Sequence, residues 1–462
     1  MLTDESIQQF KQQLRGRLIQ RSDTEYAMSC KIYNAMIEKK PLLIVKCADV
    51  ADVIASVNFG RDNKLLIAVR CGGHNGGGLS ICDDGIVIDL SGINYVQVDP
   101  DRKQVTVGGG TTWGSVDHAT HAFGLAVPSG IISTTGVGGL TLGGGIGHLT
   151  RSYGLTIDNL VSADVVLADG SFVHANASQH PDLFWALRGG GGNFGVVTAF
   201  TFRAHPVSTV YAGPMLWEVE KAPEILRWYR DFIKNAPESI NGFFLYLIVP
   251  PGPPFPENLH LKNMCGIVWT HTGTQEEAEK ALAPIRKKFP PALDLVGLLP
   301  QPALQGMFDA LYPAGHQWYW RADYFNELTD EAIDAHMKFG TKIPTMQSSM
   351  HLYPVNGRAA RVGKNDTAWS FRDAIWAEVI VGVDPDPTNK EKITKWTKDY
   401  WEALHPHSAG GAYINFMMEE GNERIMATYR DNYDKLAAIK SKYDPDNVFR
   451  VNQNIKPAAV MA

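Results

Sequence analysis

The sequence predicts an α+β protein of two domains, and three observations lead to this prediction. The chain has 462 residues, which is more than one ordinary hydrophobic core organises. Short apolar runs of strand length alternate with longer stretches of helical periodicity. Glycine is dense before His205 and Pro206 and sparser from there to about residue 410. We therefore expect one domain over residues 1–205, a second over 206–410, and a segment, 411–462, that returns to the first domain.

In chain order, the first domain begins with helical periodicity over residues 5–40. Residues 41–47 then have the composition of a strand, and residues 48–63 have that of a helix. Short strands are expected after these at 65–69, 85–90, 95–98, 104–107, 161–167, 172–173 and 196–203. Because glycine-rich turns bound several of these runs, we expect a domain with several glycine corners.

The second domain mixes longer helices with strands. Helical periodicity covers residues 275–289 and 329–339, whereas residues 243–249 and 375–381 have the composition of strands. The proline-rich run at 249–256 is typical of a surface loop. This alternation predicts an α+β domain.

Composition excludes several classes of function. The net charge of −6 argues against nucleic acid or an anionic membrane as the main partner, because both attract a basic face. The five cysteines form no C-x-x-C pair, so neither a disulfide framework nor a zinc site is predicted. His118 and His121 have metal-like spacing but no third ligand, so no metal is expected. A small-molecule ligand remains.

The N-terminus is acidic and polar, whereas a secretory signal is basic and then apolar. No uninterrupted apolar run has the length of a membrane span. We therefore expect a cytoplasmic protein without a membrane partner.

A glycine-saturated turn around one histidine, residues 70–80, lies between two expected strands. The glycines permit positive φ and a close approach of the backbone to a ligand, which His74 then faces. The turn lacks the Gly-Lys-Ser/Thr of a P-loop and the G-x-G-x-x-G of a dinucleotide-binding Rossmann site. It predicts a loop that holds a cofactor of another class.

Two further glycine clusters follow, at 136–147 and 188–197. Each glycine costs a plain helix or strand roughly 0.5–1 kcal/mol, so we expect these residues to serve a close backbone approach. The three clusters are predicted to line one extended ligand.

These clusters, together with the C-terminal run 443–455, closely resemble the FAD-linked oxidases related to berberine bridge enzyme and 6-hydroxynicotine oxidase, within the vanillyl-alcohol-oxidase-like flavoproteins. The resemblance implies a PCMH-type FAD-binding fold whose second domain is an antiparallel sheet flanked by helices. It also implies an oxidase that takes a hydride from the CH-OH carbon of an alcohol, sugar or phenolic compound and reduces dioxygen to hydrogen peroxide. Three alternatives stay open: amine oxidation, a dehydrogenase with another acceptor, and a redox-silent flavin-binding protein.

The resemblance implies that His74 is bonded covalently to the 8α-carbon of the flavin. A cysteine that makes a second bond in many relatives corresponds to Ile132, so a single link is expected. The residues implied to bind the cofactor are His74, Arg70, Cys71, Gly72, Gly73, Asn75, Gly76, Ser80, Thr134, Thr135, Gly138, Gly139, Gly144, Gly145, Gly147, Gly195, Val197, Asn452 and Asn454.

Thr135 occupies the position at which the family admits or blocks dioxygen, and its small side chain favours an oxidase. The two phenols that relatives use as proton acceptors are replaced by Phe416 and Ile146. Because an alcohol must lose its hydroxyl proton as the hydride leaves, another base is required.

Glu378 is the first candidate for this base. It shares one face of an expected strand with Trp376 and Ile380, and it stands six residues after Arg372, a spacing similar to that of an active-site glutamate in plant cannabinoid synthases. A buried glutamate in a flavin cleft would have a raised pKa. The other interpretation is a solvated glutamate on an edge strand.

His148, directly after the second glycine cluster, is the weaker candidate, because an isolated histidine at a helix start is more often a capping or packing residue. Tyr153 and Tyr413 are expected either to line the site or to pack with their hydroxyls hydrogen-bonded. Two aromatic clusters, 318–321 and 351–353, form either the substrate wall or a core contact.

Overall fold

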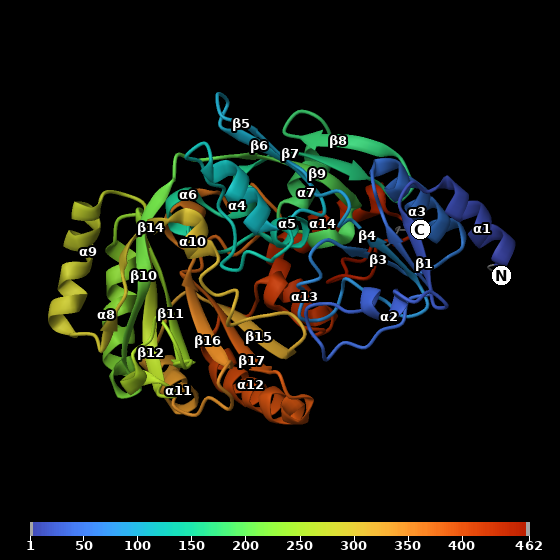
Figure 1. The fold of residues 1–462 in the computed structure, drawn as a ribbon. Helices are drawn as coiled ribbons and strands as arrows, with labels where there is room; N and C mark the ends of the chain where they lie inside the picture. The colour runs from blue at the N-terminus through green and yellow to red at the C-terminus, as the bar shows by residue number, and fades with distance from the viewer. Residues whose placement is uncertain (1–2, 459–462) are drawn as a thin grey trace.

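The computed structural model describes residues 3–458, which form three β-sheets with helices packed against them (Figure 1). The first sheet has the order β1-β2-β4-β3. Its strands are β1 (Arg17–Gln20), β2 (Leu43–Lys46), β3 (Ile67–Arg70) and β4 (Ile86–Asp89). Because β3 and β4 pair in parallel, the glycine turn leaves the end of β3 at the same edge of the sheet where β4 ends.

The second sheet is antiparallel, with the order β5-β6-β9-β7-β8. Its strands are β5 (Val96–Asp99), β6 (Gln104–Gly108), β7 (Leu160–Val166), β8 (Phe172–Asn176) and β9 (Val196–Arg203). The helices of this region are α3 (Val50–Asp62), α4 (Trp113–His121), α5 (Val137–Gly143), α6 (Thr150–Tyr153) and α7 (Pro181–Leu187). Part of the second glycine cluster therefore forms a short helix, α5.

The third sheet is also antiparallel and follows the path β13-β10-β12-β11-β16-β17-β15, with β14 paired to β10. Its strands are β10 (Thr209–Glu218), β11 (Ile240–Ile248), β12 (Asn263–His271), β13 (Leu293–Asp294), β14 (Gly297–Pro300), β15 (Gln317–Phe325), β16 (Ser349–Pro354) and β17 (Trp376–Asp384). This sheet begins just after the predicted domain boundary at residue 205, although the division into domains itself stays a prediction.

Helices cover one face of the third sheet, as the outer layer in Figure 1 shows. They are α8 (Ala222–Asn235), α9 (Gln275–Lys288), α11 (Asp330–Gly340) and α12 (Lys390–Leu404), and a short helix, α10 (Gln301–Gln305), packs near α4. Every residue of β16 and β17 is buried, so the opposite face is covered as well. That opposite face meets the glycine clusters of the N-terminal half.

The end of the chain packs against the N-terminal half. Helices α13 (Asn422–Tyr429) and α14 (Tyr433–Tyr443) and the segment up to Ile455 share one hydrophobic core with β6, β7 and β9. Within residues 3–458, no helix combines the length and the apolar character that crossing a bilayer requires.

The prediction of helical periodicity over residues 5–40 is wrong beyond the first helix. Helix α1 (Asp4–Gln13) is followed by β1 and by a short helix, α2 (Tyr26–Ser29). At Gly16 the chain passes so close to β2 that a Cβ atom would lie 2.1 Å from the carbonyl oxygen of Lys46. Pairing of β1 with β2 thus overrides the local helical pattern.

Candidate active site

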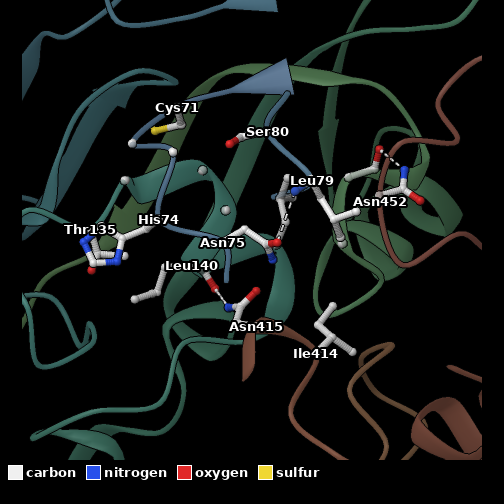
Figure 2. Close-up of a pocket in the computed structure, with 18 of the residues that line it drawn as sticks. Cys71, His74, Asn75, Leu79, Ser80, Thr135, Leu140, Ile414, Asn415 and Asn452 are labelled. Carbon is white, nitrogen blue, oxygen red and sulfur yellow. Dashed lines mark hydrogen bonds between the residues drawn. The ribbon is translucent and has the colours of Figure 1, made fainter. Parts of the chain in front are cut away.

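A cavity lies where the three glycine clusters, the third sheet and the C-terminal segment meet (Figure 2). One wall is formed by the turn after β3, by α5 with the loop before it, and by residues 191–197. The opposite wall is formed by β15, β16 and β17, and residues 413–416 and 449–453 complete the lining. Segments that are distant in sequence therefore build one site.

The glycine wall consists of exposed peptide groups. A Cβ atom on Gly72 would lie 2.5 Å from the backbone nitrogen of Gly136, so the first two clusters touch backbone to backbone. Cβ atoms on Gly139 and Gly192, by contrast, would meet no atom within 4 Å, and both residues line the cavity. Such a wall leaves room for a flat or phosphate-bearing ligand and presents peptide dipoles to it.

Polar atoms without partners also point to a ligand. The hydroxyl of Ser80 and the amide oxygen of Asn452 are buried, line the cavity and have no hydrogen-bond partner within residues 3–458. The Asn452 amide nitrogen donates to the carbonyl of Gly192 at 3.2 Å, a contact drawn in Figure 2. Buried polar atoms are normally hydrogen-bonded, so a polar ligand such as FAD fits the arrangement.

His74 lies in the cavity wall with its imidazole half-buried. Its ring stacks on Tyr33, with 3.7 Å between ring centroids. Nε2 lies 3.1 Å from the hydroxyl of Thr134, while Nδ1 makes no hydrogen bond to any residue in the described range 3–458. Loss of water around the ring lowers the pKa of His74 to about 3. The imidazole is therefore neutral at physiological pH and retains a nitrogen lone pair.

Most of the predicted cofactor residues meet at this cavity. Those that line it are Cys71, Gly72, Gly73, His74, Asn75, Ser80, Thr135, Gly138, Gly139, Gly195, Val197 and Asn452. Thr134 contributes through its contact with His74. The remaining predicted residues, which are not part of the lining, are Arg70, Gly76, Gly144, Gly145, Gly147 and Asn454.

Arg70 has a structural role here. Its guanidinium forms a buried ion pair with Asp89 at 2.8 Å and donates to the carbonyl of Ser29 at 2.8 Å. Gly145 lies behind the lining, where its backbone nitrogen donates to the hydroxyl of Tyr413 at 2.8 Å. Motif membership therefore identifies residues that shape the turns as well as residues that face the ligand.

The prediction that Glu378 lies in the flavin cleft is not met. In the register of the third sheet, Val379 stands opposite His351, and Val379 lines the cavity. Because side chains alternate along a strand, Glu378 projects to the other face, where its carboxylate lies 3.7 Å from Nδ1 of His336 on α11. Burial, with a smaller contribution from Asp323, raises its pKa well above the ordinary value.

His148, the other predicted base, and Tyr153, which is predicted to line the site or to pack, both lie outside this cavity. His148 is buried against Phe243, and neither of its ring nitrogens has a hydrogen-bond partner among residues 3–458. Tyr153 stacks on His205, with 4.2 Å between ring centroids. Neither His148 nor Tyr153 belongs to the cavity lining.

Tyr413 does line the cavity, but its hydroxyl is already occupied. It accepts hydrogen bonds from the backbone nitrogen of Gly145 at 2.8 Å and from the amide of Asn415 at 2.7 Å. Burial raises the pKa of Tyr413 to about 12. Ile146 and Phe416 also face the cavity, so these two positions present hydrocarbon there.

Of the two interpretations of the aromatic clusters, the structure favours the substrate wall. Trp318, Trp320, His351 and Tyr353 all line the cavity. Sequence reasoning missed Tyr33 and Tyr312, which also line it and which stand in no recognisable motif. Within residues 3–458, no Asp, Glu, Lys or Arg belongs to the lining. The substrate side is therefore aromatic, apolar and uncharged.

Two protein-family models match the chain: an FAD binding domain over residues 41–176, and "berberine and berberine like" over 412–456. An FAD-linked oxidoreductase of Dictyostelium discoideum is 32% identical over 456 residues, which cover 98% of this chain and 97% of the relative.

Two solved structures share the fold. The 6-hydroxy-D-nicotine oxidase of Arthrobacter nicotinovorans matches with a TM-score of 0.85 and 26% identity, covering 96% of this chain and 98% of that one. A glucooligosaccharide oxidase of Acremonium strictum, described with a 6-S-cysteinyl, 8α-N1-histidyl FAD, matches with a TM-score of 0.85 and 24% identity over 96% and 98% of the two chains. Together with the 32% identity above, these findings show that the chain belongs to the FAD-linked oxidoreductases related to berberine bridge enzyme.

Proposed function

We propose that the protein is an oxidase with FAD bonded covalently to His74, and that it oxidises a carbon bearing a hydroxyl group. The observation that carries this proposal is the position of the His74 imidazole, which stands in the wall of a glycine-lined cavity. Burial lowers the pKa of His74 and favours the neutral ring. FAD held by these residues would supply the redox chemistry: it would take a hydride from the substrate carbon and pass two electrons to dioxygen, giving hydrogen peroxide.

The contact with Thr134 is compatible with the tautomer that the covalent bond requires. When Nε2 carries the proton, it donates to the Thr134 hydroxyl at 3.1 Å, and Nδ1 keeps its lone pair for bond formation. A second bond through sulfur has no evident donor, because Ile132 occupies the position of the family's cysteine. Cys71 lines the cavity, but burial raises its pKa to about 11, which keeps it a thiol.

The uncharged lining favours an alcohol over an amine. An aliphatic amine is a cation near neutral pH, and no carboxylate among the described lining residues compensates for its desolvation. A neutral alcohol enters such a cleft without that cost. An aromatic wall of Trp318, Trp320 and Tyr353 suits an apolar or ring-bearing molecule.

Thr135 lines the cavity and supports dioxygen as the electron acceptor, since its side chain is small. The protein is reduced anaerobically with dithionite and then exposed to air. Rapid return of the yellow colour is expected of an oxidase. Slow return would instead favour a dehydrogenase that uses another acceptor.

The covalent bond is tested by acid precipitation of the purified protein. We expect the flavin to stay in the wild-type pellet and to wash out of the His74→Ala variant. Retention in both proteins would place the bond on another residue. Loss from the wild type would contradict the covalent bond while leaving FAD binding itself intact.

A further inference from the structure

A hydrogen-bonded group of three side chains lies on the substrate side of the cavity. Nδ1 of His351 is 2.7 Å from the hydroxyl of Tyr353, and Nε2 is 3.4 Å from the hydroxyl of Tyr312. All three residues line the cavity. His351 and Tyr353 belong to β16, and His351 stands opposite Val379 in the register.

This group lies close to His74. The Tyr33 ring stacks on His74 at 3.7 Å, and its hydroxyl donates to the backbone carbonyl of Tyr312 at 2.6 Å. Trp318 lies between the two tyrosines, 4.9 Å from the ring of Tyr33 and 5.8 Å from that of Tyr312. One aromatic layer therefore connects the point of flavin attachment with the hydrogen-bonded group.

The other titratable groups of the lining are committed elsewhere. His74 is the proposed flavin ligand, and the Tyr413 hydroxyl already accepts two hydrogen bonds. The Tyr33 hydroxyl donates to the backbone carbonyl of Tyr312, and the Cys71 thiol donates to the carbonyl of Thr111 at 3.5 Å. Among the described lining residues, this leaves His351 with its two tyrosines as the group able to receive a proton.

We propose that Tyr353 and His351 remove the hydroxyl proton of the substrate, a role that rests on the proposed function. The substrate hydroxyl donates to the oxygen of Tyr353, whose own proton passes to Nδ1 of His351. In the tautomer that carries its proton on Nε2, His351 donates to the Tyr312 hydroxyl and leaves Nδ1 free to accept. Tyr353 is the residue that touches the substrate, and Tyr312 is a positioning residue.

The step balances in atoms and electrons. The alcohol loses one proton through Tyr353 to His351 and one hydride from its carbon to FAD, and a carbonyl product forms. Dioxygen then takes up the two electrons and two protons to give hydrogen peroxide, and His351 returns to the neutral form. Burial lowers the pKa of His351 to about 3 and raises the pKa of Tyr353, so both side chains are neutral before the substrate binds.

The test measures flavin reduction in anaerobic stopped flow, with benzyl alcohol and cellobiose as alcohol probes and benzylamine as the amine probe. We expect Tyr353→Phe and His351→Gln to slow reduction by the better alcohol about 10²- to 10⁴-fold, the usual contribution of a general base. Tyr246→Phe is the matched control. Tyr246 is a buried tyrosine on β11 whose hydroxyl has no partner within residues 3–458, and it packs with the helices on the far face of the sheet.

Two further measurements separate a proton-transfer role from a structural one. Reduction by dithionite and covalent flavin content should stay at wild-type levels in both variants. In His351→Ala, added imidazole should restore part of the alcohol-dependent rate in proportion to its concentration. The isosteric Tyr353→Phe variant keeps the test decisive if a His351 variant fails to fold.

Near-normal reduction by alcohol in Tyr353→Phe or in His351→Gln overturns the assignment and leaves the proposed function standing. An equal loss in Tyr246→Phe also overturns it, because the effect would then be structural. Reduction of the wild type by benzylamine alone overturns the proposed function, and so does failure of both alcohols. In either case the assignment of Tyr353 and His351 as the proton-accepting pair is overturned together with the proposed function.

Discussion

Glu378 and His74 show how differently two single residues can be interpreted from sequence. His74 stands in a local pattern, because the glycines that expose it are its neighbours in the chain. Whether Glu378 reaches the cavity depends instead on which face of β17 meets the cavity. Alternation groups Trp376, Glu378 and Ile380 correctly, yet that face packs on α8, α11 and α12. Both faces of β17 are buried, so hydrophobic alternation carries no signal for the choice.

Glu378→Gln is therefore expected to leave the rate of flavin reduction by alcohols close to that of the wild type. The substitution should also alter how stability depends on pH. The folded-state pKa of Glu378 is raised above 4.5, so folded protein keeps a proton that the unfolded chain releases. The wild type thus loses stability as the pH rises above about 4.5 toward the folded pKa, by up to about 1.4 kcal/mol per pH unit, whereas the glutamine variant does not.

Urea unfolding of the wild type and of Glu378→Gln at several pH values measures this difference. The free energy of unfolding of the variant should increase relative to that of the wild type with each step toward higher pH. A stability difference that is independent of pH would contradict the raised pKa. A large fall in flavin reduction would return Glu378 to the list of proton acceptors.

At the scale of elements, the sequence predicts most strands and helices but not the partners that they meet. The strand predicted at 196–203 is β9, and the helix predicted at 275–289 is α9 (Gln275–Lys288). The prediction of a helix over residues 5–40 fails because Gly16 and β1 pack against β2. Local periodicity carries no information about such a tertiary contact. The substrate wall is missed for the same reason, since Tyr33 and Tyr312 reach the cavity only through tertiary packing.

The second glycine cluster gives an element-scale prediction, because two of its glycines differ in what surrounds them. In Gly136→Ala the new methyl group would lie 2.4 Å from the backbone nitrogen of Gly72 and 2.6 Å from the sulfur of Cys71. We expect a loss of about 1–3 kcal/mol in the free energy of unfolding, the usual cost of overpacking.

In Gly139→Ala the methyl group meets no protein atom within 4 Å but enters the cavity from α5. The apoprotein should gain about 0.5–1 kcal/mol, because alanine favours a helix, while the affinity for FAD should fall. Urea unfolding of the apoprotein, and fluorescence titration with FAD in a His74→Ala background that cannot form the covalent bond, measure the two effects. Unchanged FAD affinity in Gly139→Ala would show that this part of the cavity does not hold the flavin.

At the scale of the whole molecule, one buried cation joins the third glycine cluster to the C-terminal segment. The ammonium group of Lys440 on α14 donates to the carbonyl of Asn193 at 2.7 Å, to the carbonyl of Phe449 at 2.9 Å and to Asp444 at 2.6 Å. Asn193 belongs to the third glycine cluster, and its side chain accepts from the backbone nitrogen of Ile455 at 2.9 Å. One cation thus links a predicted cofactor loop with the C-terminal segment.

Lys440→Met should remove this link and leave the carboxylate of Asp444 buried without its cation, since both side chains are 0% exposed. Breaking a buried ion pair in this way typically costs about 3–5 kcal/mol in the free energy of unfolding. The matched control is Lys442, two residues further along the same helix. Lys442 pairs with Asp182 at 2.6 Å with its side chain 60% exposed, so Lys442→Met should cost less than about 1 kcal/mol.

Urea unfolding of the two variants, and the rate at which their apoproteins take up FAD, test this link at both levels. We expect Lys440→Met to unfold at lower urea and, because Asn193 and Gln453 both line the cavity, to take up FAD more slowly. Lys442→Met should match the wild type in both measurements. Equal stabilities of the two variants would mean that water replaces the lysine ammonium beside Asp444, and that the C-terminal segment is held to the cofactor loop by apolar packing alone.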